Sequence, residues 1–275
     1  MEVSVGDKVI MSKYAGTEVK LDGEDCLLYT SDTGLVIVNH ASNVCGSIQD
    51  IAAIGQIAHK HGSLFLVDSA QSAGVVPIDV EAMHIDMLAF AGHKSLMGPL
   101  GTGWLYVREG LMLDTIIEGG SGSSSESRQQ PDIMPDRLVS GTANMPAIAA
   151  LGEGIKFIRR IGIDAILAHE RELAQRFVDG AKQMDGITLY GGAPAHGVGV
   201  VSLNIKGKNC VEVARELDSR YKIAVRSGLH CAPLAHQTLG TLEQGGTVRF
   251  SFGYYTTRAE VDRALSALNK ICKEV

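Results

Sequence analysis

The stretch from Thr33 to residue 107 alternates short apolar runs with a helical pattern, and this feature constrains the fold more than any other. Apolar runs of four or five residues are typical of strands covered on both faces. Between the first two runs, isoleucine and alanine recur at helical spacing over 51–58, and Gly62 stands where a helix would end. Strands that alternate with helices predict an α/β fold with a mainly parallel sheet. The expected strands are 35–38, 63–67, 87–90 and 103–107.

The second half of the chain predicts a smaller α+β domain. Two long helical patterns, 146–160 and 164–184, come first. We expect strands at 187–190, 198–205 and 248–252, and helices at 209–221 and 258–274. The Gly/Ser-rich residues 119–131 form either a plain linker or an active-site lid.

The first 31 residues differ from the rest of the chain, because they predict short strands and turns. Residues 6–8 favour a turn, 9–11 are a short apolar run, and Leu21-Asp22-Gly23 is typical of a hairpin. We therefore expect this segment to make few contacts with the other residues. The predicted divisions are 1–31, 32–160 and 161–275.

Composition narrows the classes of function. Of the 275 residues, 45% are apolar and 20% charged, and the net charge of −6 gives no electrostatic reason to bind nucleic acid or an anionic membrane. No apolar run approaches the roughly 18 residues of a membrane helix. The N-terminus has charges where a signal peptide needs an apolar stretch. The five cysteines include no C-x-x-C pair, which predicts a reducing cytoplasm and neither a disulfide framework nor a metal site.

Two groups of residues follow predicted strands, where ligands bind in open α/β sheets. Asp68 ends one strand and Gln71 lies three residues on. Asp68 either pairs with a ligand or caps a helix that begins at Ser69. Lys94 follows the next strand. It is either a surface lysine or, in a partly desolvated pocket, an amine that can form an imine with an aldehyde.

The run 226–233 predicts a loop that contains a potentially reactive cysteine. Arg226 and His230 accompany Cys231, and basic neighbours favour the reactive thiolate. The alternative is an inert thiol. Arg249 lies within a predicted strand, where it either grips a carboxylate with its planar fork or forms a surface salt bridge.

These separate patterns occur in the order of a known family. The runs 39–46 (NHASNVCG), 67–72 (VDSAQS), 92–94 (GHK) and 226–232 (RSGLHCA) resemble the successive signatures of cysteine desulfurases and their class V aminotransferase relatives. The resemblance covers residues 33–275. It implies part of the large domain of a fold-type-I pyridoxal-phosphate (PLP) enzyme, followed by a complete small C-terminal domain.

The resemblance also implies a cofactor site. Lys94 would be the Schiff-base lysine, and Asp68 would pair with the pyridinium nitrogen of PLP. Gln71 would bind the phenolic oxygen of the ring. His93 would help to hold the phosphate, and Thr142 would reach a phosphate across the interface of a homodimer.

On the substrate side, Asn43 would face the cofactor and the carboxylate of L-cysteine or a related amino acid. Arg249 would grip that carboxylate. Cys231 would take the sulfur as a persulfide and release alanine, with a protein as a potential sulfur acceptor. Selenocysteine lyase, another class V lyase or aminotransferase, and a non-catalytic fragment are the alternatives.

Two departures from the family pattern accompany the resemblance. Ala91 stands where relatives usually have a Ser or Thr that contacts the phosphate. Family members also begin before Thr33 with a phosphate-binding turn and a residue that stacks on the ring. Here residues 5–31 instead resemble the C-terminal part of a ten-kilodalton co-chaperonin, which makes chaperonin binding a further, minor alternative.

Overall fold

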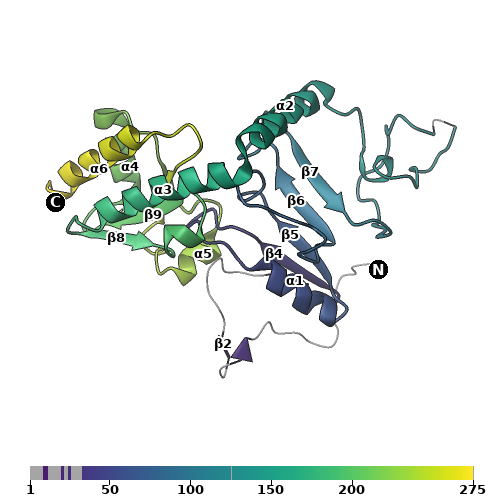
Figure 1. Ribbon diagram of the computed structural model, residues 1–275, viewed down its shortest axis with the longest axis horizontal. Coiled ribbons are helices and arrows are strands. Elements are labelled where there is room, and N and C mark those ends of the chain that lie inside the picture. Colours follow the sequence, from purple (N-terminus) through teal and green to yellow (C-terminus); the bar gives the residue numbers. More distant parts are fainter. Residues whose placement is uncertain (1–8, 12–19, 22–23, 26–32, 125, 275) are drawn as a thin grey trace.

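The computed structural model describes residues 33–124 and 126–274, together with the backbone of residues 9–11, 20–21 and 24–25. Two units, each with its own sheet, lie side by side, and the long helix α3 runs from one towards the other (Figure 1). The strands are β1 (Val9–Met11), β2 (Lys20–Leu21), β3 (Glu24–Asp25), β4 (Leu35–Asn39), β5 (Leu64–Asp68), β6 (Met87–Ala91), β7 (Gly103–Val107), β8 (Ile187–Tyr190), β9 (Val200–Ile205), β10 (Arg226–Gly228) and β11 (Thr247–Ser251). The helices are α1 (Ile51–Lys60), α2 (Met145–Ile161), α3 (Ile163–Ala181), α4 (Cys210–Tyr221), α5 (Pro233–Thr238) and α6 (Arg258–Cys272), with 3-10 turns η1 (Asp136–Leu138) and η2 (Pro194–His196).

The larger sheet confirms the predicted α/β class. Its strand order is β1-β4-β5-β6-β7. The first four strands are parallel, and β7 runs antiparallel to β6. The register places Asn39 beside Asp68 and Asp68 beside Ala89. The carboxyl ends of β4, β5 and β6 therefore meet at one edge, where the segments that carry the predicted site residues begin.

Each of the central strands β4 and β5 is fully buried on one face only. Val36, Val38, Phe65 and Val67 pack in a core with α1. The alternate residues of both strands are only partly buried. Our expectation that these strands are covered on both faces therefore holds fully for one face and partly for the other, within the described part of the chain.

The N-terminal strand β1 corrects the expectation that the first 31 residues stand apart. Val9–Met11 pairs in parallel register with residues 35–37 of β4. The short strands β2 and β3 pair antiparallel. This agrees with the hairpin pattern, of which residues 22–23 lie outside the described part of the chain. An apolar run of three residues can add to the open edge of a sheet because pairing satisfies its backbone groups. The other residues before Thr33 lie outside the described part of the chain.

The smaller unit is built on an antiparallel sheet of order β10-β11-β9-β8, beside which α4 and α6 lie in Figure 1. Its core contains Phe177 of α3, Phe250 and Phe252, whose rings lie within 4.5 and 5.3 Å of Phe177. The helix starts follow local signals. Asn144 and Asn209 cap α2 and α4, and Thr257 and Glu260 form a capping box at α6.

The segment after β4 connects the two units. The hydroxyl of Ser202 on β9 donates to the carbonyl of Val44 at 2.5 Å. Ser47 forms a β-bridge with Gly197, and the N–H of Val198 donates to the carbonyl of Gly46 at 2.8 Å. The chain that leaves the larger sheet is thereby fixed against the smaller unit.

Two further expectations concern the Gly/Ser-rich residues 119–131 and the absence of a membrane helix. Among the described residues of 119–131, none belongs to a helix or strand, so the linker and lid alternatives both stay open. In the described part of the chain, no helix combines the length and the apolar character needed to cross a bilayer.

Candidate active site

The predicted site residues Asp68, Gln71 and Lys94 follow neighbouring parallel strands. Asp68 is the last residue of β5, and its Oδ1 accepts the backbone N–H of Ala70 at 2.9 Å. Its Oδ2 lies 3.5 Å from the side-chain nitrogen of Asn39, the last residue of β4. Residues 69–75 form turns rather than a helix. The carboxylate therefore caps a turn, and the alternative that it caps a helix from Ser69 is wrong.

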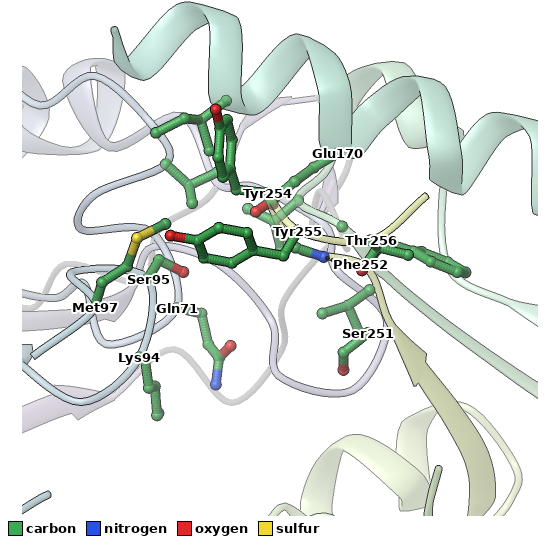
Figure 2. Close-up of a pocket in the computed structure, with 16 residues that line it drawn as sticks. Gln71, Lys94, Ser95, Met97, Glu170, Ser251, Phe252, Tyr254, Tyr255 and Thr256 are labelled. Atoms are coloured by element: carbon green, nitrogen blue, oxygen red, sulfur yellow. Dashed lines mark hydrogen bonds between the residues drawn. The ribbon is translucent and has the colours of Figure 1, made fainter. Parts of the chain in front are cut away.

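Gln71 and Lys94 line one cavity of about 400 Å³ between the two units. Figure 2 shows these two residues on one side, Glu170 of α3 on the other, and the ring of Tyr255 between them in this view. Lys94 is exposed and lies in a turn closed by the N–H of Met97, which donates to its carbonyl at 2.9 Å. The amine of Lys94 is thus on a short, tightly turned loop rather than on an extended linker.

Glu170 is a buried acid that sequence reasoning did not single out. Its side chain is 7% exposed. Burial raises its pKa from 4.5 to about 7, although a hydrogen bond from the backbone of Gly199 acts in the opposite direction. A glutamate within a helix reads as part of a solvated face, so no local signal could have identified it.

Asn43 contacts a different part of the site from Asp68. Its side-chain amide donates to the backbone carbonyl of His230 at 2.6 Å. Its own backbone carbonyl accepts Nη1 of Arg249 at 2.8 Å. The structure therefore joins Asn43 and Arg249, two predicted substrate-binding residues, to the cysteine-bearing segment. Neither Asn43 nor Asp68 is among the residues that line the cavity.

Cys231 is exposed and lies beside a guanidinium. Nη2 of Arg226 is 3.2 Å from its Sγ. The backbone at His230 and Cys231 is left-handed, with φ of 50° and 62°, and the N–H of Ala232 donates to the carbonyl of Leu229 at 2.8 Å. This tight turn projects the thiol outward, next to a group that stabilises negative charge on sulfur.

His230 fixes this turn from beneath. Its ring is 2% exposed, and Nε2 lies 3.1 Å from both the carbonyl and the hydroxyl of Thr247 on β11. The ring of the buried His236 is 5.5 Å away. Burial first, and then the charges of Arg249, His236 and Arg226, lower the pKa of His230 to about 4. A neutral imidazole is therefore part of the packing under Cys231.

The run 226–233 is more ordered than the predicted loop. Arg226–Gly228 forms β10, which pairs antiparallel with β11, and Pro233–Thr238 forms α5. Only residues 229–232 form the turn between these elements. The register also places Arg226 directly opposite Arg249. Arg226, which the sequence marked only as a neighbour of the cysteine, is thereby part of the site.

His93 and Thr142 are the two predicted phosphate contacts, and in the described structure neither is bonded to the residues around Cys231. His93 is exposed directly before Lys94. Thr142 is exposed in the segment between η1 and α2. No group of three or more potential metal ligands occurs among the described residues.

Comparison with known proteins identifies the family of this chain. The model of the aminotransferase class V family matches residues 14–264, a range that begins before the predicted boundary at residue 32. A probable cysteine desulfurase of Methanothermobacter thermautotrophicus is 39% identical over 243 residues, which are 87% of this chain and 60% of that relative.

Solved structures agree with the fold. The apo structure of cysteine desulfurase from Thermococcus onnurineus NA1 matches with a TM-score of 0.78 and 36% identity, over 89% of this chain and 61% of that chain. The cysteine desulfurase CsdA from Escherichia coli matches with a TM-score of 0.80 and 27% identity, over 90% and 61%. This chain thus spans about 60% of the length of these relatives. Because the family model matches most of its residues, the chain belongs to the aminotransferase class V family.

Proposed function

We propose that this chain acts as a PLP-dependent cysteine desulfurase that converts L-cysteine to L-alanine and leaves the sulfur on Cys231. The observation that carries the proposal is the exposed thiol of Cys231, which Arg226 contacts at 3.2 Å next to the linked pair Asn43 and Arg249. A nucleophilic sulfur beside an arginine that can bind a carboxylate is suited to the removal of sulfur from an amino acid. The relatives named as cysteine desulfurases support the same function.

The charge of Asp68 supports PLP as the cofactor. Both of its oxygens face neutral donors, from Ala70 and Asn39, and no cationic side chain of the described residues forms an ion pair with it. A partly buried carboxylate without a cation is costly. The protonated ring nitrogen of PLP would supply the missing partner, so the residues present fit this group.

The cofactor contacts are proposed residue by residue. Lys94 would bind the aldehyde carbon through its amine, Gln71 the ring oxygen, and His93 and Thr142 the phosphate. Ala91 has no hydroxyl to add to the phosphate contacts. Bound PLP would supply an electron sink that weakens the bonds around the α-carbon of the amino acid.

The residues of this chain would then position and receive the sulfur. Arg249 would hold the substrate carboxylate in its planar fork, and Asn43 would orient Arg249 through its carbonyl. The Cys231 thiolate would attack the substrate sulfur, forming an S–S bond as the C–S bond breaks. Arg226 would stabilise the negative charge on the cysteine sulfur before the attack.

A homodimer in the cytoplasm completes the proposal. Large apolar side chains are exposed around the segment that carries Thr142, which supports its burial against a second copy. They are Met112 (52%), Ile116 (97%), Ile117 (70%), Ile133 (71%) and Met145 (63%).

The test is to add PLP to the purified chain and record its visible absorbance. We expect a band that borohydride removes and that Lys94→Ala lacks, and production of alanine from L-cysteine, with sulfide released from the Cys231 persulfide when a thiol reductant is added. Arg108→Ala, which changes a basic residue paired with Asp86 away from the site, is the matched control for the band. A keto acid in place of alanine would indicate an aminotransferase. The absence of both band and turnover would indicate a non-catalytic chain.

A further inference from the structure

The pair Arg226 and Arg249 is electrostatically unfavourable as it stands. These residues are directly opposite each other on the neighbouring antiparallel strands β10 and β11. Directly opposed residues share one face of a sheet, so the two cationic side chains are neighbours. Like charges in such positions destabilise the pairing, unless an anion lies between or beside them.

No anion of the described chain compensates this pair. Arg176, Arg220 and Arg258 each form an ion pair with an acidic side chain. Neither Arg226 nor Arg249 forms one with any described Asp or Glu. The Nε of Arg249 is buried and has no hydrogen-bond partner in the described structure. Burial lowers the pKa of Arg249, Arg226 lowers it further, and Cys231 has the opposite effect.

The proposed substrate and the thiolate compensate the two positive charges only for part of a reaction cycle. A substrate carboxylate on Arg249 and a thiolate beside Arg226 carry one negative charge each. When the amino acid product leaves, Arg249 is again without an anion, while the sulfur remains on Cys231. Two guanidinium groups beside a persulfide then form a site that favours a small, doubly charged oxyanion.

We propose that this site accepts a small sulfur oxyanion, and that sulfite takes the outer sulfur from the Cys231 persulfide and leaves as thiosulfate. This step rests on the proposed function, because desulfuration supplies the persulfide. The lone pair of the sulfite sulfur attacks the outer sulfur and forms a new S–S bond. The bond between the outer sulfur and Sγ breaks, and its electron pair stays on Sγ as a thiolate. The charge is three negative before and after, and no oxidant or reductant is needed.

The geometry suits each part of this step. Arg226 contacts Sγ, the leaving atom, at 3.2 Å and stabilises the thiolate that forms. Arg249 would hold the sulfite oxygens, since its buried Nε has no hydrogen-bond partner in the described structure while Nη1 is bonded to the carbonyl of Asn43. Cys231 is exposed, so a solvent-borne anion can reach it. A neutral thiol acceptor would gain nothing from the two cations.

The reverse half-reaction tests the site without PLP. The full chain is incubated with thiosulfate alone. We expect Cys231 to gain one sulfur atom by intact-mass and peptide analysis, with release of one equivalent of sulfite. Arg249→Gln should slow this reaction at least about tenfold, because charge-assisted hydrogen bonds to the anion are lost. Arg258→Gln, an equal charge change at an exposed ion pair with Glu172, should react like the parent chain.

A second measurement keeps the result decisive if Arg249→Gln folds poorly. Sulfate, an unreactive dianion, should protect Cys231 of the parent chain from iodoacetamide, whereas chloride at equal ionic strength should not. No sulfur on Cys231 and no protection by sulfate would overturn the proposal, even if the chain desulfurates cysteine. Sulfur transfer from thiosulfate without any PLP-dependent turnover would support the oxyanion site and reject the desulfurase function.

Discussion

The side-chain amide of Asn43 donates to the backbone carbonyl of His230 at 2.6 Å, across 187 positions of sequence. This bond ties the turn that carries Cys231 to the segment that follows β4. We expect Asn43→Asp to loosen the turn, because a carboxylate cannot donate to the carbonyl and repels it. Loss of about 1 kcal/mol would raise the amide exchange rate of Ala232 about fivefold. Hydrogen exchange measured by mass spectrometry checks this.

Asn209→Asp is the matched control for that variant. It makes the same chemical change at the start of α4, where aspartate caps a helix as well as asparagine does. Exchange at Ala232 that is equal in both variants would show that the Asn43 amide does not hold the turn.

Cys231 and Lys94 should have separate roles in the proposed reaction, sulfur transfer for Cys231 and cofactor binding for Lys94. Cys231→Ser is expected to reduce sulfide release to background and to leave the visible absorbance of bound PLP intact, because a hydroxyl is a weak nucleophile towards sulfur near neutral pH. Lys94→Ala should remove both. Cys272→Ser is the control, since this cysteine lies at the end of α6. Undiminished turnover in Cys231→Ser would favour a lyase that needs no protein thiol.

Glu170→Gln should stabilise the protein at alkaline pH. Burial raises the pKa of the carboxyl from 4.5 to about 7, so the folded state holds its proton in a range where the unfolded chain has lost it. The free energy of unfolding therefore falls as pH rises from 4.5 to 7 and this penalty is complete above 7. Glutamine stays neutral and can still accept from Gly199. We expect a gain of up to about 3 kcal/mol at pH 8 and little change at pH 4.

Urea unfolding at several pH values measures this difference. Glu172→Gln, two residues along α3, is the control with the opposite sign. Its carboxyl is exposed, and a hydrogen bond from Arg258 lowers its pKa. A Glu170→Gln variant whose stability follows the parent at every pH would show that the carboxyl is not desolvated.

His230 should make the fold sensitive to acid. Its pKa is lowered to about 4 by burial first and by the neighbouring cations second. The unfolded chain therefore binds a proton near pH 6.5, whereas the folded state binds it only near pH 4. The free energy of unfolding falls as pH drops from 6.5 towards 4. In His230→Gln, the amide can donate to Thr247 without this titration, so the acid-induced loss should shrink by up to about 3 kcal/mol.

Thermal melting between pH 4 and 7 checks the His230 prediction. The buried His40, whose pKa burial also lowers to about 4, remains in the variant, so part of the acid sensitivity should persist. His196→Gln, at an exposed position, should leave the profile unchanged. A profile for His230→Gln identical to that of the parent would contradict the assignment.

Local sequence patterns were sufficient to predict most helices and strands of the fold. The strand 187–190 was predicted with its observed bounds, and the start of α6 follows from Thr257 and Glu260, which cap one another within four residues. The strand β10 was missed because Arg226-Ser227-Gly228 has no apolar alternation. It is a strand only because β11, about twenty residues on, offers it a partner.

The sequence predicted where the candidate site residues lie in the fold, but not which contacts they make. Asp68, Gln71 and Lys94 could be placed at one sheet edge because parallel strands end on the same side. The opposition of Arg226 and Arg249 depends on register, which the sequence of β10 does not encode. The burial of Glu170 depends on Gly199, where an added Cβ would lie 3.1 Å from the carboxyl oxygen.

The helix α3 belongs to two cores, and this limits how the molecule can move. Ile166 and Leu167 pack with Ala41 and Ile158 beside the larger sheet, whereas Phe177 lies in the core of the smaller unit. A helix of 19 residues is a stiff rod about 28 Å long. Hinged closure of one unit on the other would pull one end of this rod out of its core. In the proposed reaction, the displacement that carries Cys231 to a substrate would therefore come from the four-residue turn 229–232.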